Sequence, residues 1–441
     1  MGKRKIIICI LSSLIPGSLW SQTSLKDLVN QGLTKSYKSK IRKLNQGIAA
    51  REFADRYTPF LPTIDLSAGR NYSWSEQVSD DFKLQESVSN TADVSISLPL
   101  WDNGNRVTEY ERAKLAKDLS DISIFKETQD YVLEVLRAWY ELQTFYGERT
   151  IKRSERSNVR KSFLKAKELV ALGMKTPLDV YDLNIRLDRL RRDLIKLKTD
   201  QETAQKKLNL LVDPEVKILV NPVNIVKNKP WFVGQFLIAL PQIRAQIAKG
   251  LPGNHPDIRI AKIGEEQAKL NYLQSTRDRW PQVAASAGYT FDFSPAINTQ
   301  EEDYGRSHVK GANIALSLSW DLWDWYSIER RVNSSYDNLD IQRLEMKQSQ
   351  RSATLDLKNK LHSYDLVSVS LKISKKILNK AIKQYQFSRE MYKLGKITVL
   401  ELKEATLTLA ESRLDLVNSV KDSHLLMAEI LNDYGISILP P

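Results

Sequence analysis

The chain has almost no cysteine. Its single cysteine, Cys9, follows Ile8 in an N-terminal segment that begins with basic residues and continues as an apolar run over residues 6–19. The run is short for a spanning helix of about 20 residues, so it predicts a secretory signal peptide over residues 1–21 rather than a membrane anchor. Ile8 stands where a lipoprotein signal has a small residue, which argues against lipid attachment. The mature chain then has no disulfide, thiolate nucleophile or thiolate metal site.

Catalytic motifs are also missing. There is no glycine-rich phosphate loop, HExxH or G-x-S-x-G pattern. The acidic groups around residues 76–86 and 301–303 fall between predicted strands and are expected to be solvated loops, with calcium or receptor binding as the alternative. The four histidines are dispersed, without metal-ligand spacing: His255, His308, His362 and His424. We therefore predict no enzymatic activity, no metal site and no cofactor.

Long hydrophobic runs are absent after the N-terminal segment. No apolar stretch reaches 18 residues, so no membrane-spanning helix is predicted. The net charge of +13 comes from 66 Lys and Arg against 53 Asp and Glu, which alternate along helical segments. Such alternation is typical of solvated helix faces, and together with export it argues against nucleic acid as a partner.

The sequence contains an internal duplication. Residues 172–180 reappear as residues 394–402, and Leu-Trp-Asp at 100–102 recurs at 322–324, both 222 positions later. The Leu-Pro at 61–62 pairs with Trp-Pro at 280–281. A unit of this length is too long for a solenoid repeat. We predict a first repeat over residues 22–211, a proline-rich connector over 212–253, a second repeat over 254–434 and a tail over 435–441.

Each repeat contains two segments that alternate apolar and polar residues. They cover residues 63–74, 91–101, 283–293 and 312–322. Alternation over this length predicts strands with one apolar face, long enough to cross a bilayer at a tilt. Taken singly, each could be a half-buried strand of a soluble sandwich. Aromatic residues near the strand ends are expected at the membrane interface: Tyr72, Trp74, Trp101, Trp320 and Trp323.

The remainder of each repeat is helical. Residues 103–172 contain no proline, and apolar residues recur every 3.5 positions, the period of a coiled-coil seam. The seam is clearest in two series: Val132, Val135, Trp139, Leu142 and Tyr146, then Leu183, Leu187, Leu190, Leu194, Leu197, Gln201, Ala204, Leu208 and Leu211.

Each repeat is expected to end in a helical hairpin. Gly173 and Gly395 are placed for left-handed helix ends, and Thr176 and Thr398 for capping the following helix. Asp179 falls in a first helical turn, where an acid complements the helix dipole.

Four strands cannot close a barrel, so several chains must share one if the strands enter a membrane. At this point the chain resembles the TolC family of outer-membrane efflux proteins, through ordered landmarks in each repeat: a proline before the first strand (Leu-Pro or Trp-Pro), then Leu-Trp-Asp, then Leu-Gly-x-x-Thr. The resemblance implies a mainly helical fold with membrane strands. Three chains would form a 12-stranded β-barrel in outer-membrane lipid of a Gram-negative bacterium, above a coiled-coil helical tunnel in the periplasm.

The resemblance also implies a function. The homotrimer would be the exit duct of a tripartite efflux or type I secretion system, joined to a periplasmic adaptor and an inner-membrane transporter. The alternatives are a periplasmic adaptor, which usually has one hairpin and no membrane-length strands, or a secreted coiled-coil scaffold, which leaves the strands without a role. A wide tunnel encodes little selectivity, so the sequence does not distinguish drugs, metals and proteins as cargo.

In that family an Asp, a Tyr and an Arg at the hairpin tips close the periplasmic aperture. The Asp and Tyr correspond to Asp179 and Tyr392, but the Arg falls on Ile397, with Lys396 adjacent. This difference puts in doubt an ion pair that would close the tips. Tyr326 stands where the first repeat has Gly104, so the helix starts are expected to differ. The resemblance further implies that the tips meet the adaptor through Leu172, Gly173, Thr176, Leu394, Gly395 and Thr398.

Overall fold

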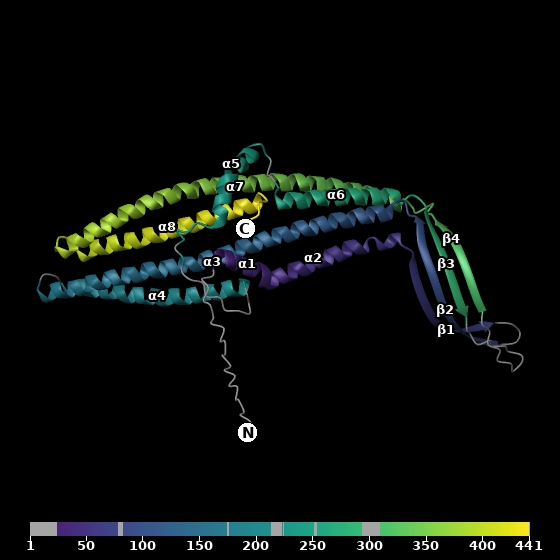
Figure 1. Cartoon of the computed structure of the whole chain (residues 1–441), viewed down its shortest axis with the longest axis horizontal. Helices are drawn as coiled ribbons and strands as arrows, with labels where there is room; N and C mark the ends of the chain where they lie inside the picture. Colours follow the sequence, from purple (N-terminus) through teal and green to yellow (C-terminus); the bar gives the residue numbers. More distant parts are fainter. Residues whose placement is uncertain are drawn as a thin grey trace, which may run out of the picture.

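The chain forms an elongated molecule with helices along most of its length and a sheet at one end (Figure 1). A computed structural model describes residues 24–77, 83–173, 176–212, 223, 225–250, 254–292 and 309–440. The predicted signal peptide lies outside them. The elements in order are α1 Leu25–Lys35, α2 Tyr37–Asp55, a 3-10 helix Thr58–Phe60, β1 Thr63–Gln77, β2 Lys83–Trp101, α3 Asn105–Ala171, α4 Pro177–Val212, α5 Trp231–Ala248, α6 Pro256–Arg277, β3 Gln282–Asp292, β4 Val309–Ser319, α7 Ser327–Lys393 and α8 Val399–Asp433.

The elements of the first half recur in the same order in the second. Helices α3 and α7 both contain 67 residues, and each begins and ends 222 positions from its counterpart, the offset of the sequence motifs. At 1.5 Å per residue each is about 100 Å long. Helices α4 and α8, which return from the tips, contain 36 and 35 residues.

The four strands form one antiparallel sheet in the order β1-β2-β3-β4. Strands β1 and β4 are therefore its two edges. Strand β4 ends at Ser319, so the prediction of a strand through residue 322 was wrong at this end. Directly after the strand, Trp320 donates its indole N–H to the carbonyl of Arg279, 3.0 Å away. Phe293, predicted to end the third strand, lies outside the described residues.

The hairpin between β1 and β2 is longer than predicted. Cα partners continue to Trp74–Glu86 and Gln77–Lys83, so Glu76 and Glu86 lie within strands rather than in a loop. The strands were predicted from the alternation of apolar and polar residues, and the charged residues of this hairpin interrupt that alternation. Residues 80–81 and 301–303, the rest of the predicted acidic loops, lie outside the described part of the chain.

The long helices lie side by side in one layer, with α3 inside it and α7 along one edge (Figure 1). Helix α3 packs against α2 and α4 and also against α6 and α8, and α7 packs against α6 and α8. The coiled-coil prediction for α4 is confirmed, since five of its seam residues are at most 6% exposed: Leu183, Leu190, Leu197, Ala204 and Leu208. Burial of one such leucine contributes about 1.5–3 kcal/mol. No described helix is both long and apolar enough to cross a bilayer.

The main core lies midway along the molecule, where α1 and α5 join the long helices. Leu136 and Leu142 of α3 meet Ile430 and Leu431 of α8 there. Helix α5, in the predicted connector, contributes Phe232 and Phe236. Its proline, Pro241, is within the helix.

A tyrosine and a histidine form a buried pair of titratable side chains in this core. The Tyr140 hydroxyl and His424 Nδ1 are 2.9 Å apart. Burial, with Lys229 nearby, lowers the pKa of His424 to about 4, because a charged imidazole in an apolar setting is costly. His424 therefore remains neutral when the chain is folded near pH 7.

We expect acid to weaken this core. Between about pH 6.5 and pH 4 the unfolded chain binds a proton at His424 that the folded chain does not, so stability falls as pH falls, by up to about 3 kcal/mol. Guanidinium unfolding midpoints at pH 7 and pH 4 measure the change. The variant His424→Asn should lose less than the parent, and an equal loss in both would contradict the assignment.

Candidate functional site

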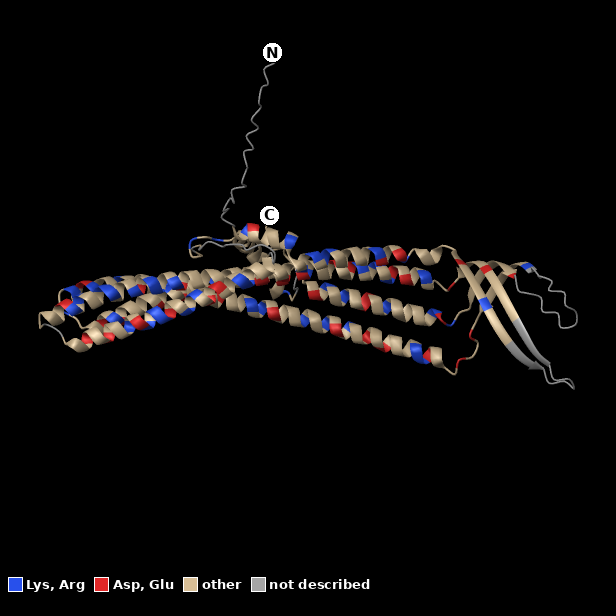
Figure 2. Ribbon diagram, turned by 90° about the horizontal axis from the view of Figure 1, so that it is seen from below, with Lys and Arg blue, Asp and Glu red and all other residues tan. Residues whose placement is uncertain are grey.

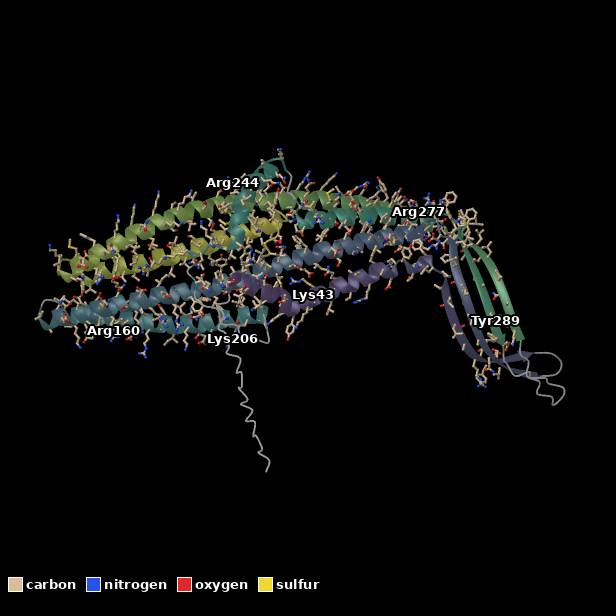
Figure 3. The ribbon with its side chains drawn as sticks, in the orientation of Figure 1. Lys43, Arg160, Lys206, Arg244, Arg277 and Tyr289 are labelled. Carbon is tan, nitrogen blue, oxygen red and sulfur yellow. The ribbon has the colours of Figure 1, made fainter. Side chains whose placement is uncertain are left out.

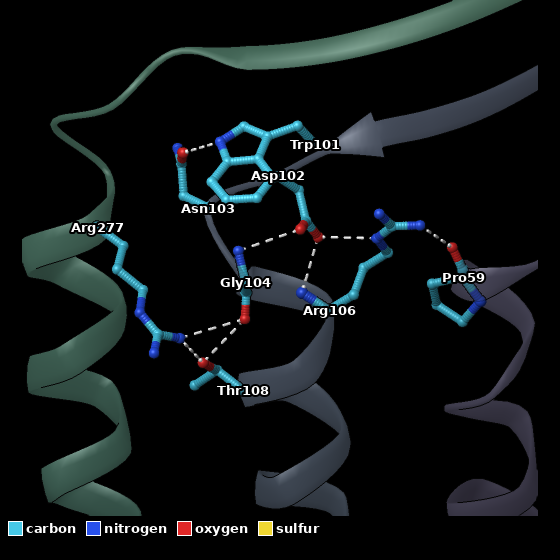
Figure 4. A network of polar contacts seen from close by, with 8 residues as sticks. All are labelled: Pro59, Trp101, Asp102, Asn103, Gly104, Arg106, Thr108 and Arg277. Carbon is cyan, nitrogen blue, oxygen red and sulfur yellow. Dashed lines mark hydrogen bonds and ion pairs between the residues drawn. The ribbon is translucent and has the colours of Figure 1, made fainter.

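Polar side chains gather where the sheet meets the helices (Figure 4). Asp102 accepts hydrogen bonds from the backbone N–H groups of Gly104, at 3.2 Å, and Arg106, at 2.8 Å. Its carboxylate also pairs with Arg106 Nε at 2.9 Å. The Asp of the first Leu-Trp-Asp motif thus caps α3 and satisfies N–H groups that have no partner within the helix.

Arg277 ties the end of α6 to the start of α3. Its guanidinium donates to Thr108 Oγ1 at 2.6 Å and to the Gly104 carbonyl at 3.3 Å. Asn103 accepts from the Trp101 indole and donates to the Trp280 carbonyl. The sequence interpretation missed these residues, because only the fold brings positions more than 160 apart together. The Asn in the turn after Leu-Trp-Asp was the one available signal.

The second repeat shares the backbone turn and the Asp cap of this junction. Asp324 accepts from the backbone N–H of Ile328 at 2.6 Å. Tyr326 has φ +60°, and its counterpart Gly104 has φ +78°. The expectation that the two helix starts differ was therefore wrong for the backbone, whereas the side-chain contacts do differ, since Ile328 replaces the ion-paired Arg106. The position before each is left-handed too, at Asn103 and Trp325. For Trp and Tyr this conformation costs about 1–2 kcal/mol per residue.

The interfacial aromatics are exposed where they are described. Tyr72 is 49% exposed on β1, and Trp101 is 61% exposed at the end of β2. Trp320 and Trp323 follow β4 at 51% and 64%. Trp74 lies in β1, but its side chain is outside the described part. Three of these indoles lie at the junction, the level at which a girdle is expected.

The hairpin tips lie at the opposite end of the molecule. Gly173 and Gly395 end α3 and α7 with φ of +72° and +69°. The Gly395 N–H donates to the Tyr392 carbonyl, and the Lys396 N–H donates to the Met391 carbonyl, as in a Schellman motif. Nothing lies within 4 Å of a Cβ added at either glycine, so the backbone conformation is what requires them.

The threonines after the turns start the returning helices. Thr398 accepts from the Glu401 N–H, and Glu401 accepts from the Thr398 N–H, which confirms the predicted cap as a reciprocal capping box. Thr176 accepts from the Asp179 N–H at 3.2 Å through its carbonyl. Leu172 and Leu394 remain 70% and 68% exposed. The tips therefore present rigid turns with exposed leucines.

Three of the four residues predicted to close an aperture come together where the two hairpins meet. Tyr392 is 3% exposed and packs with Leu183 and Val399. Burial and the nearby carboxylate of Asp179 raise the pKa of Tyr392 to about 12. Ile397 packs against the same apolar cluster. Lys396 is exposed. Ile397, which stands where the family has Arg, therefore makes a hydrophobic contact.

A buried ion pair joins α3 to α4 in the first hairpin. Glu155 on α3 pairs with Arg186 on α4, with side chains 2% and 16% exposed. Lys152 approaches Glu155 at 3.7 Å and Asp193 at 3.9 Å. Sequence reasoning missed this network, because charged residues on a helix are usually solvated.

Comparison with known proteins identifies the architecture. The model of a family described as outer membrane efflux protein matches residues 54–212 and 251–423. A probable outer membrane lipoprotein, SilC of Salmonella typhimurium, is 26% identical over 190 residues. That alignment covers 41% of this chain and 38% of the relative, well under two thirds of its length.

Solved structures share the fold over nearly the whole chain. The outer membrane protein VceC of Vibrio cholerae is 14% identical, with a TM-score of 0.75 over 94% of this chain and 96% of that one. The CmeC outer membrane channel of Campylobacter jejuni is 14% identical, with a TM-score of 0.74 over 93% and 85%.

Proposed function

The chain belongs to the outer membrane efflux protein family, and from this premise we propose that three copies form one channel through the outer membrane and into the periplasm. The channel is the exit duct of a tripartite efflux or type I secretion system. Export of small molecules or proteins is passive and is driven by an inner-membrane transporter. The family consists of efflux channels, and we assign this chain no catalytic activity of its own.

The observation that carries this proposal is the four-stranded sheet, in which β1 and β4 are each paired on one side only. The sheet ends at β1 and β4, and unpaired strand edges cannot remain in lipid. The apolar sheet face is exposed, with Leu66 at 78% and Ile314 at 90%. A sheet that needs both lipid on one face and partners at both edges supports closure by further copies of the chain.

The helical flanks support the same closure. Helix α7 exposes Leu344, Leu355, Leu366, Ile373 and Ile377. Their spacings of 11, 11, 7 and 4 keep them on one face. Helix α2 exposes a matching stripe: Tyr37, Ile41, Leu44 and Ile48. Exposed apolar stripes of this length mark protein contacts. We assign them to the interfaces between protomers, and we call the α7 stripe the α7 flank.

The tips support the proposed partners. Leu172 and Leu394 are exposed beside the capped turns at the end farthest from the sheet. We propose that these turns, with Gly173, Thr176, Gly395 and Thr398, dock the periplasmic adaptor, and that Asp179, Tyr392 and Ile397 close the aperture above it.

The test is assembly and conductance of the purified chain. We expect a species of three times the chain mass on unheated gels and ion conductance in planar bilayers. Ile373→Glu, in the α7 flank, should prevent trimer formation, because it buries a charge at the interface. The matched control Leu164→Glu, at an exposed leucine of α3 outside the flank, should not. A soluble periplasmic monomer without conductance would favour the adaptor or scaffold alternatives.

A further inference from the structure

A polar cavity lies midway along the molecule, between the end of α8 at Asp433 and the start of α6 at Pro256. Both of these helices pack between α3 and α7 (Figure 1). The volume of the cavity is about 830 Å³, within the usual range of small-molecule sites, about 300–1,000 Å³. We call it the midpoint cavity. It is lined by Lys126 and Asp130 of α3, residues 255–257 at the start of α6, side chains within 345–360 of α7, and Asn432 and Asp433 of α8.

Contacts beside the break fix the positions of the helix ends. Gly435, with φ +82°, follows α8 and lies against the backbone of Asn254, just before α6. A Cβ on this glycine would be 2.4 Å from the Asn254 carbonyl oxygen, so only glycine fits there. Arg244 of α5, labelled in Figure 3, pairs with Asp365 of α7 beyond the cavity. Among the described residues none from α5 lines the midpoint cavity, so this helix does not fill it.

The lining carries an excess of negative charge. Along the long helices Lys and Arg are interspersed with Asp and Glu (Figure 2), but here five carboxylates face two lysines. Lys126 pairs with Asp257 at 2.5 Å, and Lys360 pairs with Asp433. Burial lowers the pKa of His255, so its ring adds no charge near neutral pH. Three carboxylates form no salt bridge within the described chain: Asp130, Glu345 and Asp356.

One buried amide oxygen in the lining has no partner. Asn432 is 7% exposed, and its Nδ2 donates to Asp130 Oδ1 at 3.1 Å. An ionised carboxylate only accepts hydrogen bonds, so the NH₂ group of the amide must face it. The other amide atom, Asn432 Oδ1, is buried and accepts no hydrogen bond from the part of the chain that the structure describes. A buried acceptor without a donor is destabilising, and a ligand that donates a hydrogen bond would remove that cost.

Two of the carboxylates lie close to this amide. Lys360 of α7 is held against Asp433 at the end of α8. Asp356, one helical turn before Lys360, is therefore near the level of Asn432. Asp130 reaches the same level from α3, since it accepts the amide hydrogen bond. Acceptors from three helices thus surround one end of the midpoint cavity.

The third carboxylate lies at the other end. Glu345 is eleven residues from Asp356, about 16 Å along the axis of α7. It lies beside α6, because the nearby Arg343 approaches Glu265 of that helix at 3.6 Å. Within the described chain, no three His, Cys, Asp or Glu side chains are placed to hold a metal ion together. The acceptors therefore suit an elongated ligand with separated positive charges rather than one compact ion.

We propose that the midpoint cavity binds a linear polyamine, with one protonated amine donating to Asn432 Oδ1 between Asp130 and Asp356. A second protonated amine faces Glu345. Each terminal ammonium group offers three hydrogen-bond donors and one positive charge, and the methylene chain between them passes the apolar side chains of Ala353 and Pro256. The inference goes beyond the proposed function, because one chain supplies the whole lining.

The test is isothermal titration calorimetry of the purified full-length chain in detergent, with spermine as the ligand. We expect one-to-one binding with a Kd that rises about tenfold or more between low and high salt, because screening weakens the attraction. Tetraethylene glycol, a soluble chain of similar length without charge, should not bind. Equal binding of the glycol would overturn the proposal. Displacement of spermine by Mg²⁺ at equal concentration would assign the charge to an inorganic ion and overturn it too.

Two variants test the named acceptors. Asn432→Leu removes the unpartnered oxygen, and Asp356→Asn removes an exposed charge with little risk to folding; each should raise the Kd for spermine about tenfold or more. The matched control is Asp337→Asn. Asp337 is an exposed acid of the same helix, outside the cavity and without a salt bridge in the described chain, so the Kd should change less than about twofold. Equal weakening in all three variants would indicate general charge attraction and overturn the site.

Unheated gels and conductance of the same preparations report on the proposed function separately. A conducting trimer that does not bind spermine overturns only the polyamine site. Spermine binding by a chain that forms neither trimer nor conducting channel supports the site and overturns the channel.

Discussion

Replacement of Arg186 with alanine is expected to lower the stability of the first hairpin by about 3–5 kcal/mol, because it leaves the Glu155 carboxylate buried without its main partner. Glu155 is 2% exposed, and the salt bridge that remains, to Lys152 at 3.7 Å, is longer than a direct hydrogen-bonded ion pair. The loss should be visible as a lower guanidinium midpoint of helical circular dichroism in detergent.

Two variants test whether the buried charge is the cause. Glu155→Leu combined with Arg186→Met removes both charges and should recover most of the loss, since apolar side chains can replace a buried pair without penalty. Lys165→Ala, which breaks an exposed pair with Glu168 in the same hairpin, should cost less than about 1 kcal/mol. If the double variant were as unstable as Arg186→Ala, the packing of the arginine would be the cause instead.

Tyr392→Phe and Asp179→Ala are each expected to increase the conductance of the trimer. Burial and the Asp179 carboxylate raise the pKa of Tyr392 to about 12, so its hydroxyl keeps its proton and is able to donate it in a hydrogen bond. If a hydrogen bond from this hydroxyl to the carboxylate contributes about 1 kcal/mol per chain, and the three chains separate together, its loss shifts the ratio of open to closed tunnels about a hundredfold. Tyr392→Phe keeps the ring in its apolar cluster, so it isolates the hydroxyl.

Asp182→Ala is the matched control for the aperture. Asp182 is an exposed acid on the same helix, three residues beyond Asp179, and its removal should leave conductance unchanged in planar bilayers. Equal conductance in all three variants and the parent would mean that packing around Ile397 alone holds the aperture shut. Ile397→Ala should then open it.

The sequence predicted burial correctly where apolar residues recur at a short, regular interval. Leu183, Leu190 and Leu197 recur every seven residues, and their burial needed no knowledge of distant contacts. The turns at Gly173 and Gly395 were equally local, since a positive φ after a helix favours glycine.

The residues that the sequence did not reveal act across the fold. Arg277 meets Thr108 from another repeat, and Arg186 meets Glu155 from the opposite arm of a hairpin. Each looks like a solvated cation until the register of two helices is known. The prediction for the backbone at the start of α7 was wrong for the opposite reason. Trp325 and Tyr326 adopt a left-handed conformation that their own side chains disfavour. The junction, including the Asp324 cap, imposes it.

The equal lengths of α3 and α7 restrict how this architecture can evolve. Each long helix is paired with a returning helix of nearly equal span, 36 residues in α4 and 35 in α8. One added heptad lengthens a helix by about 10 Å and preserves its seam, but in α3 alone it would lift one tip away from the other and separate Asp179 from Tyr392. A longer or shorter duct therefore requires four concerted insertions or deletions, so lineages of this protein should differ in length by whole heptads present in both repeats or not at all.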